Sequence, residues 1–248
     1  MSSPDFNKVK LVTRHSGKVT IKELQNNEID GESLIAYEFI RKLFAEFARC
    51  SLLLDSKKYN FRMFPHYFRE RQICSILTPI IHKMCNGIMM GELPVNRHHS
   101  DSDSHGWVDY WCIYKDYTFV IEVKESKDIL DTETVRKNSV VGRWNKMKEQ
   151  LTDIKGEIRS FDEKTEGVIR VGLHFVSSYS SKEYEHESAA ALIYRTSVKE
   201  TLTRFCKKLK PDYAGCWLVP EESILSWDDF AFPGVMLFGK IFPVIKHR

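Results

Sequence analysis

Hydrophobic and polar positions follow two different periods along this chain, and the first third has the period of helices. Apolar residues recur at helical spacing over 31–54, which predicts a long and well-buried helix. A second helical pattern opens at Pro65, an accepted position in a first turn, and runs to Cys85. Pro79 lies inside this second helix and is expected to kink it.

The period then changes to that of β-strands. Residues 87–97 are expected to form one strand, and the polar run 98–105 is expected to form a loop. Two further strands are predicted at 106–114 and 117–124, with a two-residue turn between them. Because apolar side chains cover both faces of this hairpin, we expect it to lie in the middle of a sheet.

The rest of the chain alternates helices with strands. The predicted elements are a basic amphipathic helix at 140–158, a strand at 167–179, a helix at 189–209, and strands at 214–220 and 234–245. This order predicts an α/β fold: a mixed central sheet with an antiparallel hairpin core, flanked by helices. We expect residues 1–60 to form an N-terminal arm and helix packed on the main α/β unit, 61–248, in one continuous domain.

Composition restricts the class of protein. The 248 residues are 42% hydrophobic and 29% charged, which is typical of a globular rather than a disordered chain. No run comes near the roughly eighteen apolar residues that a membrane span needs, and the start lacks a signal sequence. The six cysteines are scattered without a CxxC pair, which favours reduced thiols. These features predict a cytoplasmic protein that does not enter a membrane.

Charge is distributed unevenly, although the net charge is only +3. Residues 136–159 hold seven basic and three acidic side chains, and residues 195–210 hold six basic and one acidic. Such segregation suits a protein that presents one face to a polyanion. Solvated helix faces would give the same pattern, so this observation alone leaves both interpretations open.

Charged residues interrupt the buried hairpin at Asp109, Glu122 and Lys124. If residues 115–116 form the turn, Asp109 lies opposite Glu122 with their Cβ atoms about 5 Å apart. Lys124 points to the same face, because side chains alternate along a strand. A four-residue loop would instead pair Asp109 with Lys124 on that face. Two facing carboxylates in a buried sheet need compensation, which Lys124 supplies in part and a divalent cation would complete.

A third acid, Glu70, belongs to the second predicted helix. At roughly 100° per residue it falls in the middle of the apolar arc of that helix, so it is expected to point inward toward the sheet. A buried salt bridge to Arg97 would also account for an acid in this position. Glu38, at the edge of the apolar arc of the preceding helix, is a weaker substitute.

The charged residues described so far follow one order along the chain. Glu70 lies on a helix, Asp109 lies on one strand, and Glu122 and Lys124 form a Glu-x-Lys pattern on the next strand. This order resembles the PD-(D/E)XK nuclease superfamily, whose fold is called restriction-endonuclease-like. The element order from 65 to about 179 also looks like the core of that fold, so the resemblance covers roughly the middle half of the chain. Val108 stands where the proline of the motif would be.

The resemblance implies metal-dependent hydrolysis of phosphodiester bonds in nucleic acid, expected to be DNA, with Mg²⁺, or Mn²⁺ in its place. Asp109 and Glu122 would hold the metal together with the Val123 carbonyl, and Glu70 would complete the shell. Lys124 would orient or deprotonate the attacking water, or balance the charge of the transition state. The basic helix would bind the nucleic-acid backbone through Arg143, Lys146, Lys148 and Lys155. A homodimer is left open.

Three alternatives stand beside this interpretation. The hairpin charges could form a structural cluster in an inactive interaction module with a nuclease fold, in which Lys124 is satisfied by Asp109 and Glu122. The polar run could hold zinc through its metal-binding side chains, which are His98, His99, Asp101, Asp103 and His105. Trp107 and Trp111 could stack on bases, although core packing is favoured for both.

Overall fold

The computed structural model describes residues 10–16, 19–25, 29–56, 61–67, 69–99, 102–129, 135–154, 164–180, 187–224, 226–227 and 230–246. The helices are α1 (Gly31–Leu53), α2 (Glu70–Met84), α3 (Gly142–Thr152) and α4 (Glu187–Leu209). Short helical turns are η2 (Pro65–Tyr67), η3 (Lys137–Val141) and η5 (Glu221–Ser223). The strands are β1 (Leu11–Ser16), β2 (Val19–Leu24), β3 (Asp55–Ser56), β4 (Phe61–Arg62), β5 (Met89–His99), β6 (Ser102–Tyr114), β7 (Tyr117–Ile129), β8 (Val168–Ser180), β9 (Tyr213–Leu218), β10 (Ser226–Trp227) and β11 (Phe230–Ile241).

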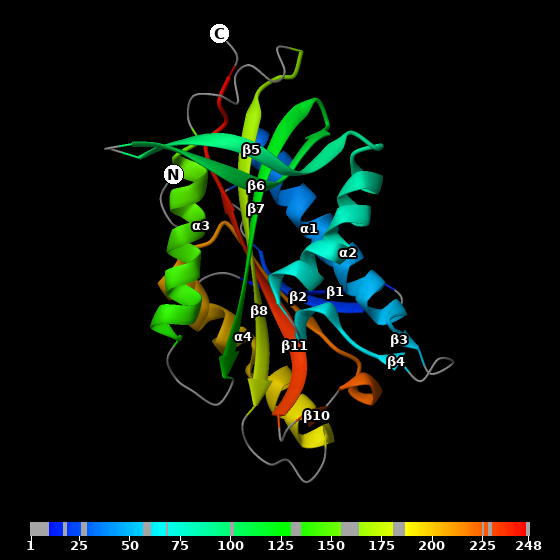
Figure 1. The fold of residues 1–248 in the computed structure, drawn as a ribbon. Helices are drawn as coiled ribbons and strands as arrows, with labels where there is room; N and C mark the ends of the chain where they lie inside the picture. The colour runs from blue at the N-terminus through cyan, green and yellow to red at the C-terminus, as the bar shows by residue number, and fades with distance from the viewer. Residues whose placement is uncertain are drawn as a thin grey trace.

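One mixed sheet organises the molecule (Figure 1). Within the described residues its strand order is β1-β2-β9-β11-β8-β7-β6-β5, with β10 beside β11. β7 and β8 run parallel, whereas the other neighbouring strands pair antiparallel. The predicted α/β class with a mixed central sheet is therefore confirmed. β1 and β2 extend this sheet at the edge opposite β5.

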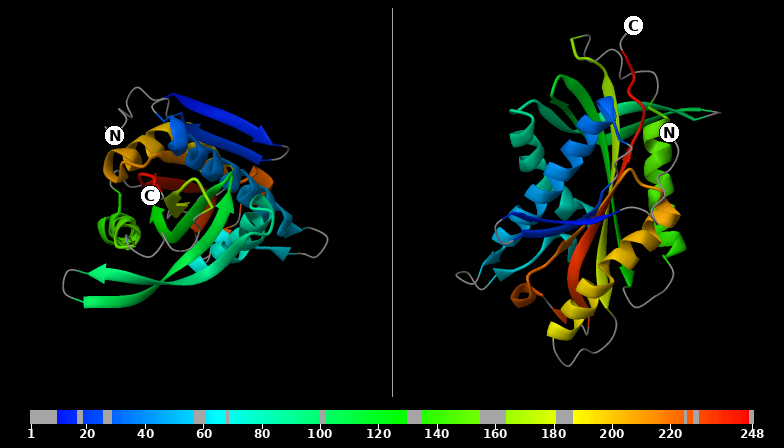
Figure 2. Two further views of the ribbon diagram at one scale, coloured as in Figure 1. Left: turned by 90° about the horizontal axis from the view of Figure 1, so that it is seen from above. Right: turned by 180° about the vertical axis from the view of Figure 1, so that it is seen from behind.

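Helices cover both faces of the sheet. α1 and α2 lie on one face, and α3 and α4 lie on the other (Figure 2). The first face carries an aromatic core that includes Phe39, Phe44 and Phe47 of α1, each 0% exposed. The second face is packed by Trp144 of α3 and Phe205 of α4. A strand between two such layers needs apolar side chains in both directions, which is why β7 is buried along most of its length.

β5 and β6 form a long hairpin that leaves the main sheet partway along. β6 pairs with β7 only from Tyr110 to Tyr114, whereas its first part, from Ser102, pairs with β5 alone. The prediction of a loop at 98–105 is therefore wrong for most of these residues. They lack the apolar pattern of a strand because a two-stranded hairpin outside the main sheet does not require apolar faces. Pro94 lies on β5, at the edge of the sheet, where its missing N–H is tolerated.

The second helix begins later than its sequence pattern predicts. α2 starts at Glu70, and Pro65 lies instead in the turn η2. Tyr67 anchors this turn in the core at 4% exposed, and Arg69 has extended backbone with φ −136°. The chain therefore changes direction after the aromatic anchor, and the α-helix can start only beyond that change.

The cysteines agree with the expectation drawn from composition. All six cysteines are thiols outside any disulfide, and four of them are buried, namely Cys85, Cys112, Cys206 and Cys216. Among the helices that the structure describes, none has the length and apolar character to span a membrane.

Candidate active site

The hairpin between β6 and β7 turns at Lys115 and Asp116, as predicted. Tyr114 pairs with Tyr117 across the turn, and Lys115 and Asp116 have positive φ angles of 48° and 63°. A two-residue turn with both residues left-handed matches the twist of its strands, although Lys-Asp is not a favoured pair for it. The register predicted for the hairpin is therefore confirmed.

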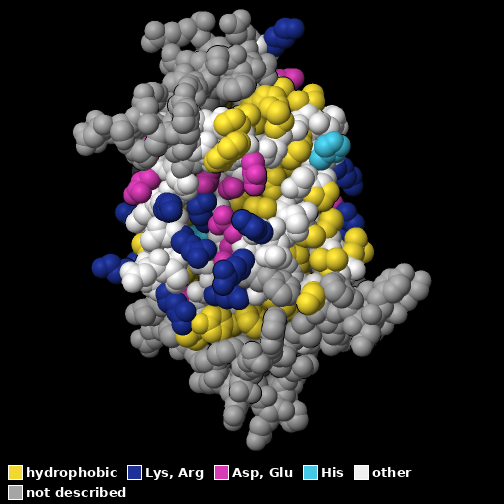
Figure 3. Space-filling view, in the orientation of Figure 1, with side chains coloured by type: hydrophobic (Ala, Val, Ile, Leu, Met, Phe, Trp, Pro, Cys, Tyr) yellow, Lys and Arg dark blue, Asp and Glu magenta, His cyan; other side chains and the backbone are white. Residues whose placement is uncertain are grey.

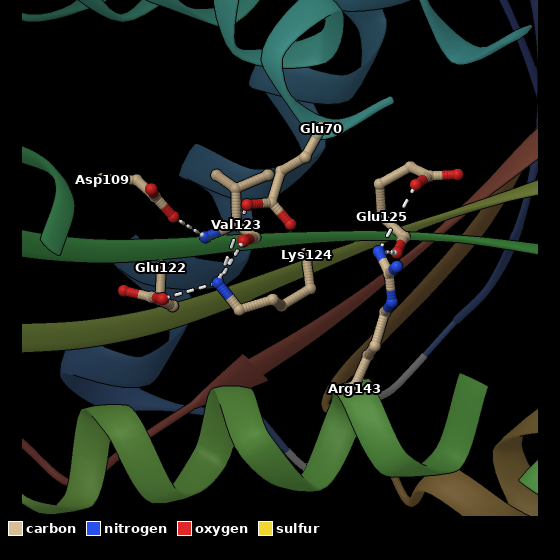
Figure 4. A network of polar contacts seen from close by, with 7 residues as sticks. All are labelled: Glu70, Asp109, Glu122, Val123, Lys124, Glu125 and Arg143. Carbon is tan, nitrogen blue, oxygen red and sulfur yellow. Dashed lines mark hydrogen bonds and ion pairs between the residues drawn. The ribbon is translucent and has the colours of Figure 1, made fainter. Parts of the chain in front are cut away.

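The ladder between β6 and β7 ends one pair before Asp109 and Glu122. Its last pair is Tyr110 with Ile121. Asp109 turns its carboxylate toward β7, where Oδ2 accepts a hydrogen bond from the Val123 N–H at 2.6 Å (Figure 4). A side chain thus satisfies the β7 backbone where β6 no longer pairs with it, and the two strands separate at this point.

Lys124 is surrounded by oxygen atoms at the same place (Figure 4). Its Nζ lies 2.6 Å from Oε1 of Glu122, 2.9 Å from the carbonyl oxygen of Val123 and 3.9 Å from Oε1 of Glu70. The Glu122 side chain is 2% exposed and that of Lys124 is 12% exposed, so this ion pair is shielded from water. The structure therefore brings together the four residues predicted as catalytic, with Asp109 as the fourth. We call these four residues the acidic cluster.

The charges of the acidic cluster keep Lys124 protonated. Burial by itself lowers the pKa of this amine, but the carboxylates of Glu122, Asp109 and Glu70 outweigh burial and raise it above its ordinary value. Lys124 is therefore an ammonium ion at neutral pH. It can donate hydrogen bonds and balance negative charge, whereas in this state it cannot take a proton from water.

Glu70 reaches the acidic cluster from the first residue of α2. Its side chain is 34% exposed and lies toward Lys124 (Figure 4). Glu70 points inward as predicted, but the start of the helix places it there. Glu38 is engaged elsewhere, because its carboxylate pairs with Lys115 at 2.9 Å. Arg97, the alternative partner of Glu70, belongs to β5, and its side chain lies outside the described residues.

A second buried acid, Glu125, lies beside the acidic cluster and was not among the predicted site residues. It is 5% exposed, and burial raises its pKa although Arg143 and Lys127 lie near it. Arg143 of α3 donates a hydrogen bond to the backbone carbonyl of Glu125, and its Nη1 lies 3.5 Å from Oε2 of the same residue (Figure 4). The only signal for this contact in the sequence is that the buried strand continues past Lys124.

Basic side chains surround the acidic side chains on this face of the molecule (Figure 3). Arg143 is 48% exposed, and Arg136, which is 43% exposed, lies 3.9 Å from Oδ1 of Asp128. Arg69 is exposed just before α2, and Lys127 donates to a backbone carbonyl of η2 at 2.7 Å. We call these four residues the basic rim: Arg69, Lys127, Arg136 and Arg143.

The residues predicted to bind nucleic acid fall in different places. Arg143 belongs to the basic rim. Lys146 is exposed on α3, and Lys148 is half-buried there. Lys155 lies outside the described residues. The sequence grouped these four residues because a sum of charges along a helix does not distinguish the faces of that helix.

A neutral histidine supports β7 beside the acidic cluster. His174 of β8 is fully buried, and its Nε2 lies 2.8 Å from Oγ of Ser126. Burial, together with nearby Arg143 and Lys124, lowers the pKa of His174 to about 3. The imidazole also stacks on Trp144 of α3, with ring centroids 6.1 Å apart. We therefore interpret His174 as a packing contact rather than an acid or a base.

The predicted metal ligands do not form a ready-made metal site. Within the described part of the chain, no three His, Cys, Asp or Glu side chains are grouped so that they could hold a metal ion. The zinc alternative cannot be compared with the structure. Asp101 lies outside the described residues, and so do the side chains of His98, His99, Asp103 and His105. Trp107 is 61% exposed, so the preference for core packing is wrong for it, whereas Trp111 is half-buried.

Comparisons with other proteins give no assignment. No protein-family model, no curated protein and no solved structure matches this chain.

Proposed function

We propose that this protein is a metal-dependent nuclease that hydrolyses phosphodiester bonds, with DNA as its expected substrate. The observation that carries the proposal is the convergence of the acidic cluster where β6 separates from β7. The element order supports a restriction-endonuclease-like fold: α2, the antiparallel strands β5 to β7, α3, and the strand β8 that returns parallel to β7.

The oxygen atoms of the acidic cluster suit a hard divalent cation. Three carboxylates and the Val123 carbonyl are ligand types that Mg²⁺ prefers. The ammonium of Lys124 already contacts Glu122 and Val123, so positive charge is stabilised at this position. We infer that Asp109, Glu122 and Glu70, with the Val123 carbonyl, would hold Mg²⁺ or Mn²⁺. When bound, the ion would acidify a water molecule and neutralise charge on the phosphate.

Two residues of the acidic cluster have roles that their contacts define. Lys124 keeps its proton because its pKa is raised. It would orient the attacking water by donating a hydrogen bond, and it would balance the charge that develops on the phosphate oxygens. Asp109 holds the Val123 N–H, and so it also fixes the backbone whose carbonyl faces Lys124.

The basic rim would hold the backbone of the nucleic acid beside the acidic cluster. Lys127 lies three residues beyond Lys124 on β7. Glu125, the residue directly after Lys124 on the same strand, contacts Arg143 of α3. Contacts from Lys and Arg to phosphates supply most of the sequence-independent affinity of such complexes. Glu125 would therefore act as a positioning residue, because it fixes a phosphate contact rather than touching the substrate.

Cleavage of labelled duplex and single-stranded DNA tests the proposal. The wild type should cut at least one substrate in Mg²⁺ or Mn²⁺, and excess EDTA should stop it. Asp109→Asn and Glu122→Gln should each reduce the rate by about a hundredfold or more, because each removes stabilisation of the reacting charge. Lys115→Ala is the control, because it removes the ion pair with Glu38 and the contact with the Tyr114 ring, both of which lie away from the site. Equal cleavage in EDTA, or by Asp109→Asn, would contradict the mechanism.

A structural ion-pair cluster is the second candidate. The 2.6 Å contact between Lys124 and Glu122 favours it, and so does the lack of a preformed three-ligand group among the described residues. The chain would then be an interaction module with a nuclease-like fold and no activity. Thermal stability with and without Mg²⁺ distinguishes the two candidates, because only a site that binds the metal gains stability from it.

A further inference from the structure

The β1–β2 hairpin forms the edge of the sheet opposite β5 and lies beside α1 (Figure 2). Residues of this hairpin and of α1 line a cleft. Its volume is about 420 Å³, which is within the range of small-molecule sites. No residue of the acidic cluster belongs to its lining, and β9, β11 and β8 lie between β2 and β7 in the sheet. The cleft is therefore separate from the acidic cluster.

Positive charge dominates the walls of this cleft. Arg41 and Lys42 come from α1, and Arg14 and His15 come from β1. Glu23 is the one acid among the wall residues that the structure describes, and it is 1% exposed. Arg14 forms an ion pair with Glu23 and so neutralises it. Arg41 and Lys42 then leave an excess of two positive charges in the wall.

Buried apolar side chains line another part of the cleft. Val19 and Ile21 of β2 are 2% and 5% exposed, and Ala45 of α1 lies with them in the lining. A site with an apolar part and a cationic part suits a ligand that has a hydrophobic ring and an anionic group. A phosphate monoester carries about −1.5 to −2 charges at neutral pH. That charge matches the excess in the wall, and the base of a nucleotide supplies the ring.

We propose that this cleft binds a nucleoside monophosphate, with its phosphate on Arg41 and Lys42 and its base against Val19 and Ile21. Arg41 makes no hydrogen bond or ion pair within the described residues, and a guanidinium can bind two phosphate oxygens at once. Lys42 Nζ lies 3.3 Å from the hydroxyl of Tyr114, which is a neutral partner. An acid that acts on both Lys42 and Arg41 is Glu38, and its carboxylate is already paired with Lys115. This site does not depend on the proposed nuclease activity.

Calorimetric titration with adenosine 5′-monophosphate tests the site, in a buffer with EDTA so that no metal can bring phosphate to the acidic cluster. The nucleotide should bind more tightly than inorganic phosphate, and adenosine should bind most weakly. Arg41→Gln should weaken nucleotide binding by about tenfold or more. Lys42→Gln, at an exposed position where the fold is not at risk, should do the same. Arg49→Gln, the same change further along α1, should have no effect because Arg49 lies outside the lining.

Four results would contradict the proposal that the cleft binds a nucleotide. They are equal binding of adenosine and the nucleotide, no binding at millimolar nucleotide, no loss in Arg41→Gln and Lys42→Gln, and an equal loss in Arg49→Gln. Binding that is kept in Arg41→Gln but lost in Asp109→Asn would place the nucleotide at the acidic cluster instead. We expect Asp109→Asn to bind the nucleotide normally. A failure of this site is therefore distinguishable from a failure of the nuclease activity.

Discussion

Replacing Asp109 by asparagine keeps one interaction of this residue and removes another. The amide oxygen can still accept the Val123 N–H, which the carboxylate now binds at 2.6 Å. The negative charge is lost, and it is one of three carboxylate charges that act on Lys124. Asp109→Asn therefore tests what the charge does, with little change in the hydrogen bonding of β7.

The charges of the acidic cluster set the expected magnitude. Three carboxylates and one ammonium give it a formal charge of −2. Unit charges about 5 Å apart interact by about 3 kcal/mol at the effective dielectric constant of a protein surface. The substitution removes two repulsions, with Glu70 and Glu122, and one attraction, with Lys124. Solvent screens these terms because Glu70 is 34% exposed. Without metal we expect the free energy of unfolding to stay unchanged or to rise by up to about 1 kcal/mol.

Metal binding should then distinguish the wild type from Asp109→Asn. At a Mg²⁺ concentration of about ten times Kd, the wild type gains about 1.4 kcal/mol, which raises Tm by roughly 3–6 °C for a chain of this length. Asp109→Asn should show little change in Tm. Thermal unfolding followed by circular dichroism, in EDTA and in Mg²⁺, measures both effects. Asp116→Asn makes the same chemical change in the exposed hairpin turn, so it should behave like the wild type.

A structural cluster would give the opposite result. Lys124 is only 12% exposed, and removing a partner from a buried charge costs about 3–5 kcal/mol. A loss of stability of that size for Asp109→Asn in EDTA, with no effect of Mg²⁺ on the wild type, would refute the nuclease reasoning.

DNA binding should weaken steeply with salt. Replacing Arg69 and Arg143 of the basic rim by Gln should reduce the slope of log K against log salt by about 1.8, as gel-shift titrations at several salt concentrations would measure. Replacing Lys207 and Lys208 of α4 should leave it unchanged, and an unchanged slope in the rim variant would mean that phosphate binds elsewhere. Asp128 is 2% exposed, and burial raises its pKa from 3.8 to about 6. Because this pKa is higher in the folded state, the stability contribution of Asp128 is present below pH 3.8 and is lost as pH rises through about 6. Asp128→Asn should therefore unfold at a higher temperature than the wild type at about pH 8 and lose that advantage at about pH 4. The same difference in Tm at both pH values would contradict this assignment.

The sequence by itself determined the β6–β7 hairpin and its turn. Apolar residues on both faces of 106–124 predicted central strands, and the period of two directed attention to Asp109, Glu122 and Lys124. The structure keeps that register through Tyr110 and Ile121. Such features could be predicted because the alternation of side chains along a strand is a local property of the backbone.

Only the tertiary structure decided which elements meet at this hairpin. Glu70 reaches Lys124 because Tyr67 in the core fixes where α2 starts. Arg143 of α3 reaches Glu125 of β7. Because β6 separates from β7, the β7 backbone is open to the side chains of Asp109 and Arg143. These contacts join segments far apart in the chain, so they leave no periodic pattern in it. A period reports which face of an element is buried, but it does not report which other element covers that face.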